Sequence, residues 1–271
     1  MNAALCKIRF ERRPRTLIGK RGLAQRRLRS SKEAAGHRGE TALADQEKIG
    51  GPPGNQRRAG YIAVEGPIGV GKTSLAQRLG RELGARLVLE APDDNPFLAR
   101  FYENPDKYAF AAQLYFLLAR YAQQRALAQQ ELFSPATVAD YLFARDRIFA
   151  QLNLAPDEFK LYERVYRLLD GALVKPDLVV YIRANVDVLL DRLRKRNRDF
   201  ERNIGYDYLE KVSDAYRDFF FYYDESPLLV VDTTEIDFVA NPGHFADLLR
   251  EIERAGPGVQ YLVPRYGSER S

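Results

Sequence analysis

The sequence contains very few of the residues on which sulfur or imidazole chemistry depends. Its 271 residues include one cysteine, Cys6, and two histidines, His37 and His244. A single cysteine excludes an internal disulfide and any cysteine-based metal cluster, and it fits a reducing compartment. Two histidines make a histidine metal site or a Ser/His/Asp triad hard to build. We therefore expect chemistry that depends on carboxylates, arginine, lysine and a hydrophilic metal ion such as magnesium.

Long apolar runs are also missing. A helix that spans a bilayer needs roughly 18 predominantly apolar residues. The longest candidate, residues 109–122, is interrupted by Gln113 and Arg120. We therefore expect a soluble, cytoplasmic protein with no membrane partner.

The net charge of +5 is unevenly distributed along the chain. Residues 1–40 hold 12 of the 42 Lys and Arg and 3 of the 37 Asp and Glu. Residues 41–271 therefore hold 30 basic and 34 acidic residues, a net charge of −4. The basic charge thus belongs to the N-terminal segment. Because the remainder is net acidic, we expect no specific nucleic-acid partner.

Residues 1–59 show no sustained apolar periodicity and are rich in Arg, Gly, Ser, Gln and Pro. Such a segment buries too little apolar surface to offset its ordering entropy, so we expect a disordered basic extension. A transit peptide, a nucleic-acid tether and an over-long start of the reading frame all remain open. The folded domain is expected over residues 60–256, followed by a C-terminal tail over residues 257–271.

Five short apolar runs predict β-strands. They are continuous rather than alternating, which is typical of a parallel sheet covered on both faces. The runs are residues 61–64, 86–89, 137–139, 178–182 and 228–231. Helical patterns cover residues 73–83, 108–132, 156–173, 186–196, 207–222 and 242–254. Right-handed crossovers then predict one α/β domain of three layers, with a five-stranded parallel sheet between helices.

Residues 66–73 read Gly-Pro-Ile-Gly-Val-Gly-Lys-Thr between the first strand and the first helix. This spacing predicts a P-loop, in which backbone N–H groups face the phosphates and Lys72 adds positive charge. Thr73 would supply a hydroxyl to Mg²⁺. A chance glycine-rich turn is the alternative, but the strand before and the helix after favour a P-loop NTPase-like fold. The predicted ATP-binding residues here are Gly66, Gly69, Gly71, Lys72, Thr73 and Ser74.

Two carboxylates and an arginine run extend this site. Glu90 and Asp140 each end a predicted strand, at the sheet edge that also holds the P-loop. One could accept a proton from an attacking hydroxyl while the other holds Mg²⁺. The run Arg192, Arg196 and Arg198 could stabilise charge on transferring phosphates, although such runs are more often solvated helix faces.

Gln113 and Arg120 share one face of an aromatic helix, since they are seven residues apart. An amide such as Gln113 can bind the edge of a nucleobase, and neighbouring aromatic rings can stack on it. An aromatic core stripe with internally satisfied polar groups is the commoner alternative.

The chain from about residue 61 to 252 resembles the deoxynucleoside kinases, in particular the bacterial deoxyadenosine and deoxyguanosine kinase type. The resemblance rests on an ordered series of motifs. These are the P-loop, Glu90-Ala91-Pro92, Tyr102 eleven residues before Gln113, Gln113 seven before Arg120, Asp140 through Asp146, Arg192 through Glu201, Tyr208-Leu209-Glu210-Lys211 and Ile236-Asp237-Phe238.

This resemblance implies the roles of individual residues. Glu90 would be the general base for the substrate 5′-hydroxyl, with Lys72 also catalytic. The nucleobase would be bound by Gln113, Arg120 and Asp146, and the sugar 3′-hydroxyl by Tyr102 and Glu201. Arg192, Arg196 and Arg198 would form a catalytic lid over the ATP phosphates. Asp237 and Phe238 would lie along the ATP adenine. From the P-loop and the strand ends, apart from the resemblance, we expect Thr73 and Asp140 to hold Mg²⁺.

The implied function is transfer of the γ-phosphoryl group of ATP, or another nucleoside triphosphate, to the 5′-hydroxyl of a deoxynucleoside, in a homodimeric salvage enzyme. Deoxyadenosine and deoxyguanosine are the expected acceptors. The alternatives are a nucleoside monophosphate kinase of the thymidylate type and a non-catalytic, kinase-like structural subunit. Intact Lys72 and Glu90 argue against the subunit.

One departure from the family pattern concerns the segment after the third strand. The family often has an acidic residue followed by Arg and Ser, whereas Tyr141 and Leu142 follow Asp140 here. Arg145 or Arg147 could supply the missing cation, or the lid could carry more of the charge stabilisation. The sequence does not choose among these.

Overall fold

The computed structural model describes residues 60–128, 136–171, 173–198, 201 and 204–264. The predicted extension, residues 265–271 of the predicted tail and the end of the helix predicted over residues 108–132 lie outside this part. Within it, six parallel strands form one sheet in the order β2-β3-β1-β4-β5-β6. The strands are β1 (Tyr61–Glu65), β2 (Arg86–Val88), β3 (Thr137–Ala139), β4 (Leu178–Arg183), β5 (Leu228–Asp232) and β6 (Val259–Leu262).

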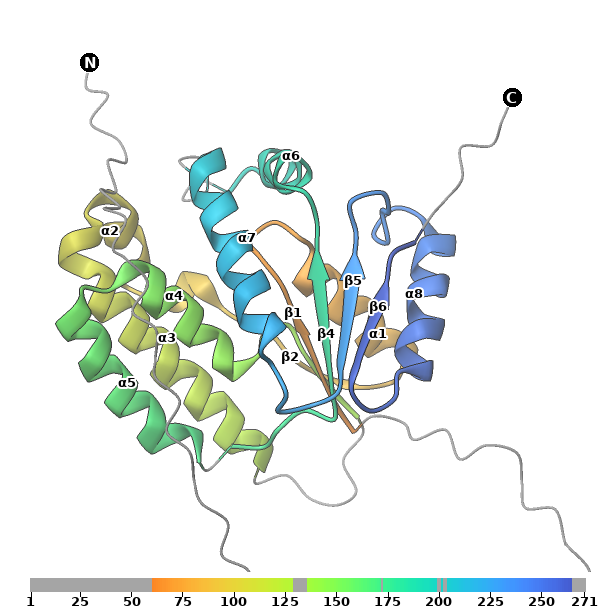
Figure 1. The fold of residues 1–271 in the computed structure, drawn as a ribbon, viewed down its shortest axis with the longest axis horizontal. Helices are drawn as coiled ribbons and strands as arrows, with labels where there is room; N and C mark the ends of the chain where they lie inside the picture. The colour runs from red at the N-terminus through yellow and green to blue at the C-terminus, as the bar shows by residue number, and fades with distance from the viewer. Residues whose placement is uncertain (1–59, 129–135, 172, 199–200, 202–203, 265–271) are drawn as a thin grey trace, which may run out of the picture. The chain divides into compact units, whose positions relative to one another are not determined.

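Helices cover both faces of the sheet, as expected (Figure 1). They are α1 (Lys72–Glu82), α2 (Leu98–Glu103), α3 (Pro105–Ala128), α4 (Asp146–Asn153), α5 (Pro156–Asp170), α6 (Val186–Arg196), α7 (Tyr206–Phe221) and α8 (Pro242–Arg254). The side chains of α1, α6 and α8 form one core with one face of the strands, and those of α4 and α7 form another on the opposite face. Helices α3 and α5 pack together beyond α4 around a third, aromatic cluster. The three-layer arrangement is therefore confirmed.

The sheet has six strands, so the prediction of five was wrong. The missing strand is β6, which pairs with β5 at the edge of the sheet and falls within residues predicted as a tail. Gln260 interrupts its apolar residues, and its burial alternates, with Val259 and Tyr261 exposed by 48% and 72%. An edge strand with one packed face does not produce the continuous apolar run by which the inner strands were recognised.

Helices α2 and α4 were not predicted either. They have 6 and 8 residues, too few to produce a clear helical period. Helix α3 begins at Pro105, three residues before the predicted start. Within the described ranges, no helix combines the length and apolar character that crossing a bilayer would need.

The topology places the carboxyl end of β1 at the centre of one sheet edge. β1 lies between β3 and β4, and the chain leaves it into the P-loop and then α1. The chain leaves β2 and β3 at the same edge, because the strands are parallel. Residues that follow these three strands are thus brought together, as the doubly wound pattern predicts.

Candidate active site

The P-loop has the backbone conformation that its glycines allow. Gly66 and Gly71 have φ of 154° and 104°, and a Cβ on Gly66 would lie 2.1 Å from the carbonyl oxygen of Ile182. A Cβ on Gly71 would lie 3.0 Å from the ring of Phe238. Only glycine fits this path without displacing its neighbours.

Lys72 lies across the mouth of this loop. Its ammonium group donates hydrogen bonds to the carbonyl oxygens of Gly66 and Pro67, at 2.7 and 3.1 Å. Burial, followed by the nearby positive charge of Arg145, lowers the pKa of Lys72 to about 8. A phosphate group would reverse this effect, because it adds negative charge beside a poorly solvated cation.

Thr73 and Asp140 come together beside the loop. The Thr73 hydroxyl donates a 2.5 Å hydrogen bond to Oδ2 of Asp140, and Oδ1 accepts one from the backbone N–H of Glu90 at 2.8 Å. A hydroxyl and a carboxylate are hard oxygen ligands that suit Mg²⁺ bound together with phosphates. The described residues include no group of three or more His, Cys, Asp or Glu side chains able to hold a metal alone. The pair therefore fits a magnesium ion that arrives with a nucleotide.

A buried row of ion pairs lies opposite the P-loop. One guanidinium, Arg120, bridges two carboxylates, since Nη2 donates to Glu90 and Nη1 donates to Asp146. Arg145 Nη2 donates to both oxygens of Glu90, at 3.0 and 2.7 Å. Burial alone would raise the pKa of Glu90, but the charges of Arg120 and Arg145 lower it to about 2. Glu90 is thus ionised. It can accept a proton only after a substrate displaces part of this network.

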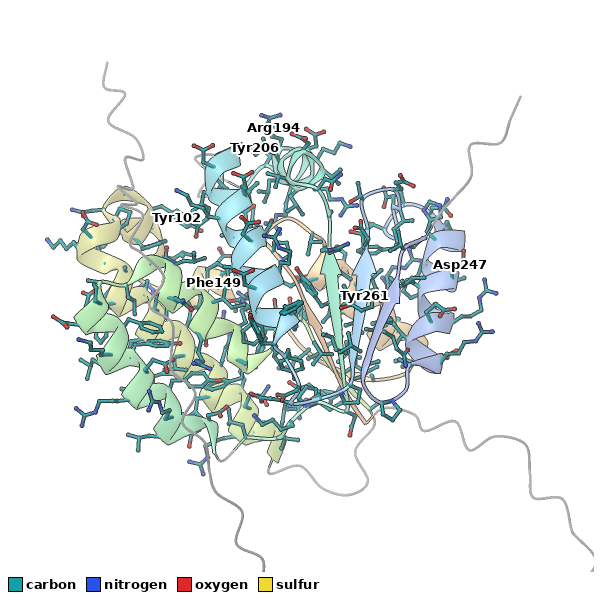
Figure 2. All side chains as sticks on the ribbon, viewed as in Figure 1. Tyr102, Phe149, Arg194, Tyr206, Asp247 and Tyr261 are labelled. Carbon is teal, nitrogen blue, oxygen red and sulfur yellow. The ribbon has the colours of Figure 1, made fainter. Side chains whose placement is uncertain are left out.

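The phosphate loop and the ion-pair row line one cavity of about 200 Å³. Phe116, Phe149 and Leu98 are among the apolar residues that line it. Figure 2 shows two of the lining side chains, Tyr102 and Phe149, between the α2–α5 helices and α7. The predicted site residues that line the cavity are Gly69, Gly71, Lys72, Thr73, Ser74, Glu90, Tyr102, Gln113, Arg120, Asp140, Asp146, Arg196, Arg198 and Glu201.

Four predicted site residues do not line this cavity. Gly66 lies at the base of the loop, and Phe238 packs against Gly71. Asp237 caps its own turn, where Oδ1 accepts from the N–H groups of Val239 and Ala240.

Arg192 differs from the other two predicted lid arginines. Its guanidinium donates to the carbonyl oxygens of Val70, Thr233 and Ile236, at 2.9 to 3.2 Å. It thus ties α6 to the P-loop and to the segment after β5 and does not face the cavity. Arg196 instead donates to both carboxylate oxygens of Glu201 at the cavity wall. The structure brings Arg196 and Arg198, but not Arg192, to the site.

One residue that lines the cavity, Arg145, and one that lies beside it, Glu65, were not assigned from the sequence. Arg145 is one of the two candidates left open for the missing cation, and it is the one that reaches Glu90; Arg147 pairs with Glu163 and is half-exposed. Glu65 was missed altogether, although it lies directly before the P-loop. An acidic residue at the end of an apolar strand was the available signal.

The comparisons with known proteins agree with this geometry. The family model described as "Deoxynucleoside kinase" matches residues 62–255. The deoxyguanosine kinase of Bacillus subtilis (strain 168) is 35% identical over 200 residues, which are 72% of this chain and 97% of that protein. The deoxyadenosine kinase of Lactobacillus acidophilus is 31% identical over 206 residues, 71% of this chain and 94% of that one.

Solved structures are similar too. A structure of deoxyadenosine kinase from M. mycoides, with the products dCMP and dCDP bound, matches with a TM-score of 0.63 and 26% identity, over 72% of this chain and 99% of that one. A second structure of that kinase, with bound dATP, matches with a TM-score of 0.62 and 25% identity, over 71% and 98%. The chain therefore belongs to the deoxynucleoside kinase family and is an ATP-dependent enzyme that phosphorylates deoxynucleosides.

Proposed function

We propose that this enzyme transfers the γ-phosphoryl group of ATP to the 5′-hydroxyl of deoxyguanosine or deoxyadenosine. The observation that carries the proposal is the cavity that joins the P-loop to a largely buried carboxylate, Glu90. A P-loop alone specifies only the phosphate donor. A carboxylate facing it across a small cavity specifies a hydroxyl acceptor, because a hydroxyl must lose a proton during transfer.

The charges at the acceptor end favour a nucleoside over a nucleoside monophosphate. The arginines there, Arg120 and Arg145, are both paired with carboxylates, and Asp146 adds a second negative charge to that of Glu90. An acceptor phosphate would need cations that are not already neutralised. A neutral deoxynucleoside needs none, so this arrangement argues against the thymidylate-type alternative.

In the proposed reaction, Glu90 accepts the proton of the 5′-hydroxyl as the oxygen attacks the γ-phosphorus. The bond from that phosphorus to the β-phosphate oxygen breaks, and ADP leaves. Lys72 and Arg145 stabilise the negative charge on the phosphoryl oxygens from the two sides of the cavity, and Arg196 and Arg198 do so from the lid. Thr73 and Asp140 would hold Mg²⁺, which would neutralise charge on the β- and γ-phosphates. Positioning and fixed charge supply most of the rate enhancement in such a transfer.

The nucleobase is proposed to lie beside α3 and α4. Asp146 and Gln113 are buried there with 1% and 5% of their surface exposed, and Asp146 Oδ2 has no hydrogen-bond partner among the described residues. A base N–H group would satisfy that oxygen, while Phe116 and Phe149 offer rings for stacking. The deoxyguanosine and deoxyadenosine kinases among the relatives support a purine.

Tyr102 and Glu201 would hold the sugar 3′-hydroxyl at the other side of the cavity. Glu201 already pairs with Arg196, so sugar binding and lid position are linked through one carboxylate.

We retain Asp237 and Phe238 as candidates for the adenine of ATP. Phe238 is supported by the contact of its ring with Gly71 of the P-loop, and Asp237 by its place next to Phe238 in the chain.

We also propose a homodimer that forms through α3 and α5. Both helices carry large apolar side chains on their outer surfaces, with Leu118, Leu161 and Leu168 exposed by 48%, 50% and 82%. Leu161 and Leu168 are seven residues apart and share one helix face. Burial of these leucines against a second copy would remove apolar surface from water.

We propose a cytoplasmic location as well, which the single cysteine fits.

The proposed kinase domain begins at residue 60 and, because β6 belongs to the sheet, continues to at least Leu262 rather than ending at residue 256. Deletion of residues 257–271 should therefore lower the melting temperature. A mere tail would leave it unchanged.

The test is an assay of the full chain with ATP, Mg²⁺ and each of the four deoxynucleosides. We expect the highest kcat/KM with deoxyguanosine or deoxyadenosine and a monophosphate as product. Thymidine monophosphate and deoxyguanosine monophosphate are assayed in parallel, as the acceptors that a nucleoside monophosphate kinase would use. Consumption of either monophosphate with no consumption of nucleosides would overturn the proposal, and so would the absence of any product from a folded sample.

A further inference from the structure

Glu65 is a completely buried carboxylate at the end of β1, with 0% of its surface exposed. It accepts hydrogen bonds from three separate segments. Oε1 accepts from the N–H of Gly66 at 2.8 Å and the hydroxyl of Tyr216 at 3.0 Å, and Oε2 accepts from the N–H of Leu142 at 2.8 Å. An ionised carboxylate is an acceptor-only group, and each of these neighbours is a donor.

A fourth donor group faces the same carboxylate. Arg145 Nη1 lies 4.0 Å from Glu65 Oε1, while Nη2 bonds to Glu90. The guanidinium therefore lies between two carboxylates, one at the base of the P-loop and one at the acceptor end. Its Nε and Nη1 atoms are buried and have no hydrogen-bond partner among the described residues. Apart from the 4.0 Å approach of Nη1 to Glu65, neither atom is committed to an acceptor among the described residues.

Arg145 is also close to the phosphate side of the cavity. It lines the cavity with Lys72, and its charge is the next cause after burial of the lowered pKa of that lysine. In the proposed reaction the 5′-hydroxyl must take one oxygen of Glu90, which displaces part of the bond from Arg145. An arginine anchored by Glu90 alone would then lose its position at the moment when the phosphoryl group needs it.

We propose that Glu65 is a positioning residue that holds Arg145 against the transferring phosphoryl group while Glu90 is engaged with the substrate. The inference rests on the proposed function, because it assigns Arg145 to the charge that develops during phosphoryl transfer. The three hydrogen bonds from Gly66, Leu142 and Tyr216 fix the carboxylate relative to the P-loop. The position of Arg145 is thereby set by the same segment that holds the donor phosphates.

A double-mutant cycle tests the link between the two residues. We expect Arg145→Gln to lower kcat by about 100-fold, since it removes one cation from the developing charge. Glu65→Gln, which keeps the shape of the side chain, should lower kcat by about 10-fold. In the Arg145→Gln background the same Glu65→Gln change should alter kcat by less than about 2-fold. Independent effects that multiply would overturn the inference.

Further variants separate positioning from a purely structural role. Glu65→Asp keeps the charge and should retain more activity than Glu65→Gln, and it provides a second measurement if the Gln variant does not fold. Arg147→Gln, two residues away and paired with Glu163, is the matched control and should keep the wild-type kcat. A wild-type kcat in Glu65→Gln with only a lower melting temperature would contradict the proposal.

The outcomes also separate this inference from the function on which it rests. A wild-type protein that phosphorylates no deoxynucleoside contradicts the proposed function. An active wild-type protein with multiplicative effects contradicts only the role of Glu65. The same cycle is also measured on the Kd for ATP with Mg²⁺. If Glu65 acts through Arg145, the effects of the two substitutions on this Kd should not multiply. Effects that do multiply would overturn the role of Glu65.

Discussion

The two ends of the cavity are built in different ways. The donor end comes from one stretch of chain, residues 66–74, and depends on backbone N–H groups and the ammonium of Lys72. The acceptor end is assembled from separate segments, with Arg120 on α3 and Asp146 at the start of α4. Each of its charges is held by another side chain rather than by the backbone.

Their charge balance differs as well. Lys72 is bonded to two neutral carbonyl groups, so its positive charge is available to an anion. At the acceptor end two carboxylates, Glu90 and Asp146, face two arginines, Arg120 and Arg145. The donor end thus suits a polyphosphate and the acceptor end suits a neutral molecule. A substitution at one end should leave binding at the other end largely unchanged, except at Arg145, which pairs with Glu90 and also lies near Lys72.

The largest expected effect comes from Glu90→Gln. It removes the proposed proton acceptor and should lower kcat by about 1,000-fold. The Kd for ATP should change little, because the donor end is intact. Steady-state kinetics with deoxyguanosine and calorimetry with ATP and Mg²⁺ measure the two quantities.

Glu163→Gln is the matched control for this substitution, since Glu163 also pairs with an arginine but lies outside the cavity. It should leave kcat unchanged. An unchanged kcat in Glu90→Gln would remove Glu90 as the base. An equal loss of ATP affinity would show that the two ends are not independent.

The same contrast explains what the sequence could reveal. The P-loop and the inner strands depend on neighbouring residues, so local patterns identified them. Glu90 and Asp140 were placed together because both follow parallel strands, and the N–H of Glu90 indeed bonds to Asp140. Strand β6 and helices α2 and α4 were missed because a half-exposed edge strand and short helices leave weak patterns.

The acceptor end was harder to predict, because it depends on which way side chains point. Arg145 and Arg147 are two residues apart, and no spacing rule decides which one faces the cavity. The bridge that Arg120 makes between Glu90 and Asp146 joins residues 30 and 26 positions away from it in the chain. Such contacts are set by the packing of α3 against α4, which the sequence pattern does not fix.

The lid arginines provide a second, smaller contrast. Arg196→Gln removes a cation from the cavity and should lower kcat by about 10-fold with little change in melting temperature. Arg192→Gln should instead lower the free energy of unfolding by about 2 kcal/mol, because buried carbonyl groups lose their donor. Thermal unfolding and steady-state kinetics of both variants distinguish the two roles.

Arg194 is the control in this run. It is 70% exposed and extends from the end of α6 away from the site (Figure 2). Arg194→Gln should alter neither quantity. If Arg192→Gln lowers kcat as much as Arg196→Gln and leaves stability unchanged, Arg192 faces the phosphates in the working enzyme.

The smallest expected effect is a difference in proton exchange between the two ends. The pKa of Lys72 is about 8 without ligand, so part of the population is neutral at pH 8.5. Phosphates favour the charged form, and ATP binding should therefore take up a fraction of a proton, with an affinity that falls as the pH rises above about 8.

Calorimetry of ATP binding at pH 8.5 in two buffers of different ionisation enthalpy measures this uptake. Binding of deoxyadenosine should show none, because Glu90, with a pKa of about 2, stays ionised at that pH and the adenine base does not titrate there. Lys72→Met should abolish the uptake on ATP binding. If the uptake persists in that variant, another group carries the proton. Proton exchange on nucleoside binding alone would mean that the acceptor end does not keep its charges balanced.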